Sequence, residues 1–325
     1  MTPEEAKAAL GPLAVMAGCE AEDARRALAA VLVPDAVVHM AFPFERRAGP
    51  EALFDAGFAS LYAAFPDLER RETIRMAGRD GAGQMWVGVC GAYVGTFAAP
   101  FLGIPPTKRA AAMRFHEFFR VEEGRVVEVQ ALWDIPELMM QAGVWPLVPP
   151  LGREWHVPGP MTQDGLTISG DGARALGIVD DMLTALGRNA DGEAAMDLPR
   201  YWHPRCAWYG PSGIGTARGI SGFRRQHQIP FLNAMPDRRG GVEAGHLFGE
   251  GNYVGYTSFA GMRATLSGGG WLGLPPTGAE LTIRSLDFWR VEGDLIRENW
   301  VLVDMLHVYD QLGVDVFARM EERLG

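Results

Sequence analysis

Two short stretches decide the fold of this chain: Gly103-Ile104-Pro105-Pro106-Thr107 and Gly273-Leu274-Pro275-Pro276-Thr277. They lie 170 residues apart, and the same spacing relates further matching residues without a gap. The matches include Gly49 with Gly219, Pro66-Asp67 with Pro236-Asp237, Arg120-Val121-Glu122 with Arg290-Val291-Glu292, and Asp134 with Asp304. Matches at one constant spacing over so much of a chain do not arise by chance, so the sequence predicts a tandem duplication of one domain.

A segment rich in proline and glycine separates the two copies. It contains Pro146, Pro149, Pro150, Gly152, Pro158, Gly159 and Pro160. Proline runs stay extended and cannot continue a helix, so this composition is typical of a linker. We therefore expect a first domain over residues 1–145, a linker over residues 146–165 and a second domain over residues 166–325.

Composition excludes several classes of protein. The length of 325 residues fits two domains, and 48% hydrophobic with 22% charged residues is typical of a globular protein with an ample core. The formal net charge of −10 argues against a nucleic-acid-binding surface, which needs clustered Lys and Arg. Three cysteines without a CxxC pair exclude a disulfide framework and favour a reducing compartment.

A membrane-bound or secreted protein is not expected either. The chain has no run of about 18 apolar residues that could span a bilayer. The apolar stretch from Ala8 to Cys19 follows Glu4 and Glu5, whereas a signal peptide begins with basic residues. The sequence therefore predicts a cytoplasmic protein without a membrane or nucleic-acid partner.

Both copies show the same order of predicted elements: a helix, a short strand, a second helix after Gly49 or Gly219, three long strands and a last helix. In the first copy the leading helix covers residues 22–32 and the strands 36–40, 84–94, 112–121 and 126–132; in the second copy the helix covers residues 173–186 and the strands 206–209, 252–260, 281–291 and 295–303. Helices followed by a meander of long strands are typical of the α+β class.

This order of elements, together with four motifs, resembles the SnoaL-like polyketide cyclase family of the NTF2-like superfamily. The motifs are Pro-Asp at 66–67 and 236–237, Gly-(Ile/Leu)-Pro-Pro-Thr, Phe-x-Arg-Val-Glu at 118–122 and 288–292, and the closing Asp-x6-Gln-x-Gly that begins at Asp134 and Asp304. The resemblance covers residues 20–145 and 172–315. It implies two tandem cone domains, each with a curved, mostly antiparallel sheet wrapped around helices and enclosing an apolar pocket.

In cyclases of this family an aspartate acts as acid and base in an intramolecular aldol condensation, without a metal or an organic cofactor. The resemblance gives that role to Asp134 and Asp304. A buried carboxylate can serve, because burial disfavours its charged form and raises its pKa. The pattern Asp134-Ile135-Pro136-Glu137 is a capping box, which would lower the pKa of Asp134. Asp304 lacks the matching glutamate, so we expect it to be the stronger catalytic candidate.

Other side chains are candidates for orienting a substrate, and each has a structural alternative. His116 could form an acid–base dyad with Asp134, or it could be an ordinary core histidine. Tyr93 stands where the family often has a histidine, and it could donate to an enolate or pack at the pocket mouth. The remaining candidates for substrate binding are Arg114 and Arg284, which could instead pair with a glutamate on the next strand, His39 and Tyr209 on the first strands, and Trp300 and Asp287 near Asp304.

The leading hypothesis is cofactor-independent chemistry, an aldol-type cyclisation or isomerisation, on a hydrophobic carbonyl-bearing small molecule. A protein that only sequesters such a molecule is the main alternative, and an interaction scaffold is a third. The seven histidines show no HxH or HExxH spacing, so no metal site is expected. Apolar positions on both faces of residues 112–121 indicate a covered sheet, so we expect an internal pseudo-dimer packed through its sheets, with further homo-oligomerisation left open.

Overall fold

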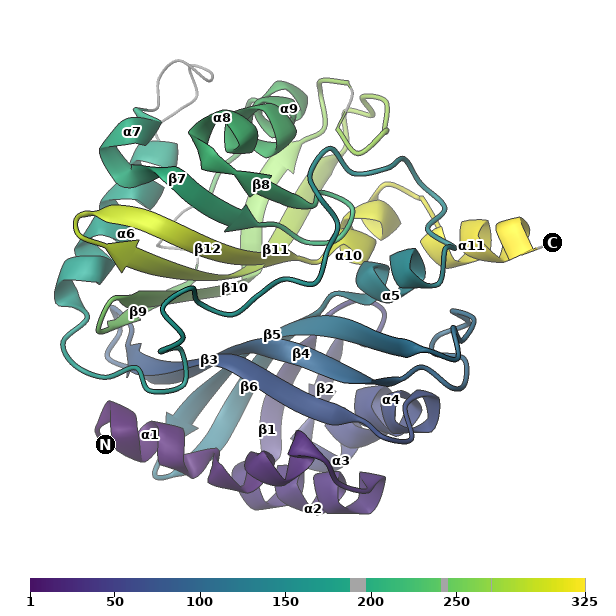
Figure 1. The fold of residues 1–325 in the computed structure, drawn as a ribbon, viewed down its shortest axis with the longest axis vertical. Helices are drawn as coiled ribbons and strands as arrows, with labels where there is room; N and C mark the ends of the chain where they lie inside the picture. Colours follow the sequence, from purple (N-terminus) through teal and green to yellow (C-terminus); the bar gives the residue numbers. More distant parts are fainter. Residues whose placement is uncertain (188–196, 241–244, 270, 325) are drawn as a thin grey trace.

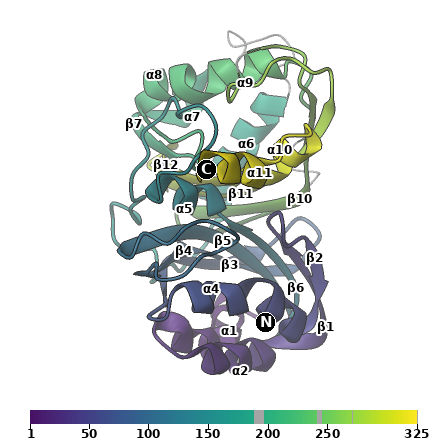
Figure 2. The same cartoon turned by 90° about the vertical axis from the view of Figure 1, so that its right-hand side faces the viewer.

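The computed structural model describes residues 1–187, 197–240, 245–269 and 271–324. Figure 1 shows two halves of similar architecture, one above the other, each with helices on its outer side and a sheet turned toward the other half. The view rotated by 90° shows the same arrangement of two facing sheets between two outer layers of helices (Figure 2). Each half therefore consists of one sheet covered by a layer of helices, which is the α+β architecture that the sequence predicts.

The first half contains six strands and the helices that cover them. Its helical segments are α1 (Pro3–Ala9), η1 (Gly11–Ala17), α2 (Ala21–Val31), α3 (Gly49–Leu53), the π-helical turn η2 (Phe54–Phe58), α4 (Ala59–Ala64) and α5 (Ile135–Gln141). Its strands are β1 (Leu32–Met40), β2 (Arg46–Ala48), β3 (Glu69–Arg79), β4 (Met85–Thr96), β5 (Ala110–Glu122) and β6 (Arg125–Trp133). They form one sheet in the order β2-β1-β6-β5-β4-β3, in which β1 and β6 are parallel and the other neighbours antiparallel.

The second half repeats this sheet in the order β8-β7-β12-β11-β10-β9. Its strands are β7 (Trp202–Tyr209), β8 (Thr216–Arg218), β9 (His246–Glu250), β10 (Tyr253–Thr265), β11 (Glu280–Glu292) and β12 (Leu295–Val303). Its helical segments are α6 (Ala173–Gly187), α7 (Leu198–Tyr201), α8 (Gly219–Phe223), η4 (Arg224–Gln228), α9 (Ile229–Ala234), α10 (Met305–Gln311) and α11 (Val316–Leu324). Elements β7, β8, α8, η4, α9, β11, β12 and α10 each begin 170 residues after their counterparts, so the duplication inferred from sequence is present in the fold.

The Gly-(Ile/Leu)-Pro-Pro-Thr motif forms the same tight turn in both copies. In the first copy Leu102 and Gly103 have φ values of 50° and 78°, and in the second Leu272 and Gly273 have 54° and 72°. Glycine adopts this left-handed conformation without a steric penalty, which explains why the motif begins with it.

The two sheets pack against each other through an apolar layer. Phe118 of β5 stacks on Phe288 of β11 with ring centroids 4.8 Å apart, and His116 Nδ1 lies 2.7 Å from the carbonyl oxygen of Leu286. Both contacts join a residue to its own equivalent, which is the signature of a two-fold arrangement. The layer also buries Ile74, Met76, Trp86, Cys90, Leu132, Ala207, Tyr209, Phe248, Tyr253, Trp300 and Leu302. This contact accounts for the apolar positions on both faces of β5.

Some elements differ from the sequence prediction. Strands β3 and β9 were not expected, because Glu69-Arg70-Arg71-Glu72 at the start of β3 is charged and lacks the pattern of a buried strand. Helix α6 lies 170 residues after α1 and η1 rather than after α2. Residues 142–172 contain no helix or strand apart from isolated bridges at Arg153 and Asp171, and the domain bounds at 145 and 165 stay predictions. No helix within the described residues is long and apolar enough to cross a bilayer.

Candidate active site

The concave face of the second sheet encloses a cavity of about 220 Å³. Its walls come from α6, α8, η4, α9 and the inner faces of β7, β10, β11 and β12. They are mainly aromatic and aliphatic, and the lining includes Leu183, Trp202, Trp208, Phe223, Phe231, Met262, Trp271, Ile283, Trp289 and Val301. Polar side chains among the apolar ones are His227, Gln228, Arg238, Tyr256, Ser258, Ser285, Asp287 and Asn299. An apolar cavity with a few polar groups is the usual form of a small-molecule site.

The equivalent space in the first half is filled by its own side chains and measures about 10 Å³. The ring of Tyr93 lies 4.6 Å from that of Phe115 and 5.3 Å from that of Trp133, measured between centroids. Beneath these rings, Arg70 Nη1 donates to Glu117 Oε2 over 2.7 Å, and Tyr93 Oη donates to Glu117 Oε1 over 2.7 Å. The first cone is therefore a packed core and not a ligand site.

Five substitutions between the copies explain this difference. Positions 58, 70, 93, 115 and 133 hold Phe, Arg, Tyr, Phe and Trp in the first half, whereas the structurally equivalent positions hold Gln228, Gly240, Met262, Ser285 and Val303. At one pair of positions the side chains change size in opposite directions. In the first half the Trp133 ring packs directly on Gly57, where a Cβ atom would lie only 2.9 Å from the ring. In the second half Val303 replaces the tryptophan and His227 replaces the glycine, so the imidazole lies beside an open cavity.

Asp287 is the carboxyl group of this cavity. It lies on β11 directly opposite Tyr256 of β10, and the hydroxyl of Ser285, two residues earlier on the same face, donates to Asp287 Oδ2. Its side chain belongs to a residue that is 7% exposed. Burial raises the pKa of Asp287 to about 7, and contacts with Ser285 and Asn299 oppose that rise only in part. Asp287 is thus divided between acid and base forms near neutral pH.

Two further groups near Asp287 stay uncharged at neutral pH. Burial raises the pKa of Tyr256 above its usual value, so its hydroxyl remains a donor. Burial lowers the pKa of His227 to about 3, so its imidazole is neutral. The His227 ring stacks on Trp208 with centroids 4.2 Å apart, and its Nδ1 has no hydrogen-bond partner within the described part of the chain.

The raised pKa of Asp287 predicts a pH-dependent effect on stability. The folded-state pKa near 7 lies above the ordinary value of 3.8, so folding favours the protonated form. The stabilisation is complete below about pH 4 and is lost as the pH rises through 7. We expect Asp287→Asn to raise the free energy of unfolding at pH 8 by roughly 2–4 kcal/mol, because three pKa units correspond to about 4 kcal/mol. At pH 4 the two proteins should differ little.

Urea unfolding at both pH values measures this effect. The exposed residue Asp35 provides the matched control, since Asp35→Asn makes the same chemical change outside the cavity. Equal stability of wild type and Asp287→Asn at pH 8 would show that the Asp287 carboxyl is well hydrated.

The structure places Asp134 and Asp304 between the halves and not in a cone. Asp134 Oδ2 accepts hydrogen bonds from Arg114 Nη2 at 2.7 Å and from the amide of Ser212 at 3.0 Å. Asp304 Oδ2 accepts the equivalent bonds, from Arg284 Nη1 at 3.1 Å and from the amide of Phe42 at 3.0 Å. These matching bonds join each closing-motif aspartate to the opposite half.

The predicted capping box at Asp134 is wrong. Asp134 makes no side-chain capping bond, and the carboxylate of Glu137 accepts the amide of Arg114 at 2.6 Å instead. Pro136 at the second helical position has no amide hydrogen, and the carboxylate of Asp134 is drawn to the other half. Asp304, by contrast, caps its helix through the amide of His307 at 3.2 Å. Burial raises the pKa of Asp304 to about 6, against the bonds from Phe42 and Arg284.

The other candidates fall into four places. Asp287 lines the cone cavity, and Tyr93 lies in the packed core of the first half. His39 and Arg284 line a second pocket between the halves. His116, Arg114, Tyr209 and Trp300 lie at the contact between the halves, where Tyr209 donates to Glu298 and Trp300 donates to the carbonyl of Pro158. His116 and Asp134 therefore do not form a side-chain dyad through any hydrogen bond of the described residues.

The sequence patterns did not single out Tyr256, His227, Ser285 or Asn299, and they gave Asp287 only a binding role. A position-by-position comparison of the two copies contains part of the signal, since the apolar Phe115 and Val129 of the first copy are replaced by the polar Ser285 and Asn299. Within the described residues, no three His, Cys, Asp or Glu side chains converge in a way that could hold a metal ion.

Comparison with solved structures gives several similar proteins, each matching about one half of this chain. IdmH from Streptomyces antibioticus, which is proposed to be a polyketide cyclase, is 22% identical over 42% of this chain and 98% of its own, with a TM-score of 0.36. AclR from Streptomyces galilaeus, proposed to be a hydroxylase, is 20% identical over 44% of this chain and 98% of its own, with a TM-score of 0.36. No curated protein matches the chain.

Comparison with protein families gives a broader match. The model of the SnoaL-like polyketide cyclase family matches twice, over residues 16–142 and over residues 181–312. The two matches together span most of the chain, and they coincide with the two halves of the fold. The chain belongs to the SnoaL-like polyketide cyclase family and contains two copies of its domain.

Proposed function

We propose that the second half catalyses cofactor-independent acid–base chemistry on a hydrophobic, carbonyl-bearing small molecule, with Asp287 as the acid and base. The observation that carries this proposal is the buried carboxyl of Asp287, with a pKa near 7, in an apolar cavity. A carboxyl poised near the working pH is what removal and return of a proton next to a carbonyl require. The family description as a polyketide cyclase supports the same reaction class.

The geometry supplies the second group that this reaction needs. Loss of an α-proton leaves negative charge on the carbonyl oxygen, and a neutral donor must meet it. Tyr256 is directly opposite Asp287 on the neighbouring strand, and side chains so paired have Cβ atoms about 5 Å apart. In this mechanism Asp287 takes the proton from carbon while the Tyr256 hydroxyl hydrogen-bonds the enolate oxygen. Asp287 then returns the proton to the same or a neighbouring carbon.

The size and walls of the cavity restrict the substrate. A dry cavity of about 150 Å³ holds one benzene molecule, so 220 Å³ suits one to two fused rings. Trp208, Trp289 and Phe231 present flat apolar surfaces to such rings. We therefore take 2-tetralone, a bicyclic aromatic ketone with acidic α-protons, as the probe for function.

Filling the cavity should abolish binding and exchange of this probe. Ser285→Phe introduces the residue that the first copy has at this position, Phe115, whose ring helps to fill that cone. We expect a loss of 2-tetralone binding, measured by calorimetry, and a fall of at least about 10²-fold in deuterium exchange of its α-protons, measured by NMR. Ser267→Phe outside the cavity lining is the control and should leave both unchanged.

The measurement also separates catalysis from simple binding. Wild-type protein that binds 2-tetralone in the cavity without accelerating exchange would indicate a protein that only sequesters its ligand. Exchange that survives in a stably folded Ser285→Phe protein would exclude the second cone as the site.

A further inference from the structure

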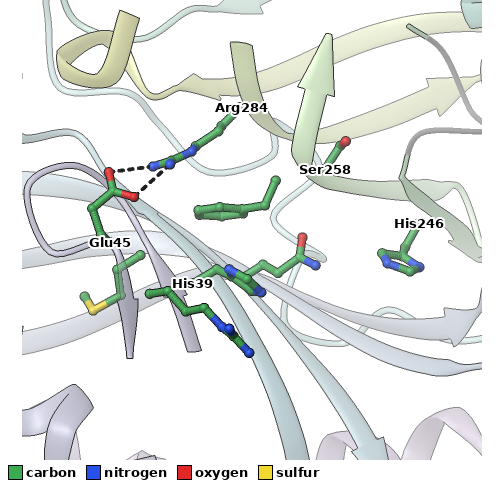
Figure 3. A pocket seen from close by; sticks show the side chains of 9 residues that line it. His39, Glu45, His246, Ser258 and Arg284 are labelled. Carbon is green, nitrogen blue, oxygen red and sulfur yellow. Dashed lines mark hydrogen bonds and ion pairs between the residues drawn. The ribbon is translucent and has the colours of Figure 1, made fainter. Parts of the chain in front are cut away.

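A second pocket, of about 370 Å³, lies between the two halves and has no role in the proposed function. Figure 3 shows its labelled side chains, with His39 and Glu45 from the first half facing Ser258, His246 and Arg284 from the second. Its lining is more polar than that of the cone cavity. The ligand it would accept must therefore differ from a hydrophobic ketone.

Two nitrogen-bearing side chains of this pocket have no polar partner among the residues that the structure describes. His39 of β1 and Arg46 of β2 are directly opposite each other in the sheet, and both line the pocket. Within the described residues, neither the guanidinium of Arg46 nor the imidazole of His39 makes a hydrogen bond or ion pair. The His39 ring rests against Phe259 of the second half, with centroids 5.4 Å apart.

The other titratable side chains named around the pocket already have partners in the protein. Arg284 Nη2 lies 2.8 Å from Glu45 Oε2, and its Nη1 also reaches Asp304 (Figure 3 shows the pair with Glu45). His246 Nδ1 lies 2.7 Å from the carboxylate of Asp80. Arg46, which is exposed where it lines the pocket, is thus the charged lining residue that has no ion-pair partner within the described residues. An unpaired guanidinium offers a forked pair of donors to an anion.

The equivalent place on the other side of the two-fold arrangement has the opposite character. His39, Arg46, Gln130 and His246 are matched there by Tyr209, Thr216, Trp300 and Ile74. The segment before α6 covers that place, because Trp155 Nε1 donates to Thr216 Oγ1 at 3.0 Å and Trp300 Nε1 donates to the Pro158 carbonyl at 2.9 Å. One side is therefore apolar and covered by the chain, whereas the other is open and basic.

We propose that the open interdomain pocket binds a small aromatic carboxylate. The planar guanidinium of Arg46 offers a forked pair of donors that matches a carboxylate, and His39 adds a donor beside it. The flat ring of the ligand lies against Phe259, whose own ring also has the Arg284 guanidinium 5.3 Å from its centroid. The ligand would contact both halves at once, and its binding would strengthen their contact.

Benzoate titrated into the full chain tests this proposal by calorimetry. We expect saturable binding to wild type and a Kd at least about tenfold higher for Arg46→Gln, since a hydrogen bond to a charged group contributes at least that much. Arg47→Gln is the matched control, because Arg47 is the next residue, faces away from the pocket lining and carries the same charge. Its Kd should stay within twofold of wild type. Benzamide, which lacks the charge, should bind at least tenfold more weakly than benzoate.

Ser285→Phe locates the binding site independently of the proposed function. Benzoate binding that persists in Ser285→Phe and weakens in Arg46→Gln supports the interdomain pocket, whatever the outcome of the ketone experiments. Equal Kd values for Arg46→Gln and Arg47→Gln, or loss of benzoate binding in Ser285→Phe alone, would overturn the proposal. Benzamide binding as tight as that of benzoate would do so as well.

Discussion

Asp287→Asn is expected to slow the exchange of 2-tetralone α-protons by about 10²- to 10⁴-fold, the usual effect of removing a general acid–base group. The amide of asparagine has nearly the shape of the carboxyl and can still contact Ser285, so the cavity keeps its form. It cannot take a proton from carbon. Binding of 2-tetralone should therefore change little while exchange is lost, which distinguishes a chemical role from a positioning role.

The pH dependence of exchange gives a second readout of the same group. Only the ionised form of Asp287 can accept a proton, and its pKa is near 7. Exchange by wild type should rise through pH 7 and level off above pH 8, because Tyr256 still holds its proton there. NMR exchange rates between pH 5 and pH 9 measure this profile. A residual rate in Asp287→Asn should lack that step.

Asp304→Asn is the control that compares this assignment with the one drawn from sequence. Asp304 is equally buried and also has a raised pKa, but it is bonded to Phe42, Arg284 and His307 between the halves. We expect its replacement to weaken the contact between halves and to leave exchange per folded molecule within a few-fold of wild type. Loss of exchange in Asp304→Asn with normal exchange in Asp287→Asn would restore the closing-motif aspartate as the catalytic group.

The fold was predictable because matching residues of the two copies lie at a constant spacing of 170 positions. The turns at Gly103 and Gly273 have a left-handed backbone, which glycine adopts without a steric penalty. Both copies therefore have glycine at this position, although many of the surrounding side chains differ between them. Strand β3 escaped prediction because its charged residues are satisfied by partners far along the chain, as Arg70 is by Glu117. Periodicity within one segment cannot show such partners.

The site was less predictable, since it depends on which face of a strand meets which half. Alternation along β5 and β11 puts His116 and its equivalent toward the opposite half, and Glu117 and Asp287 toward the cone. Both faces of these strands are apolar, so the sequence alone did not show which of their residues point toward the cone. The closing-motif aspartates end up between the halves because each accepts an amide from the opposite copy, a contact that one isolated domain cannot make.

A large loss of stability is expected when the buried ion pair in the packed core of the first half is broken. Arg70→Met should lower the free energy of unfolding by about 3–5 kcal/mol, the usual result of removing one member of a buried ion pair. Arg70 and Glu117 side chains are 3% and 6% exposed, and Arg70 also lies over the Phe115 ring at 4.1 Å. Among the described residues, the substitution leaves the Glu117 carboxylate with the Tyr93 hydroxyl and the Trp133 indole as its donors. Urea unfolding measures the change.

Two further variants show whether the loss of stability comes from leaving the buried Glu117 carboxylate without its cationic partner. Arg71→Met alters the next residue, whose side chain is 65% exposed, and should change stability by less than about 0.5 kcal/mol. Arg70→Met combined with Glu117→Leu removes both charges and should recover much of the loss, because apolar groups can replace a buried ion pair at little cost. If the double variant is as unstable as Arg70→Met, packing around Phe115 and not the charge pair holds the first cone together. Exchange of 2-tetralone by the folded protein should be unchanged in all three variants, since Asp287, the carboxyl that we propose to react, lies in the second half.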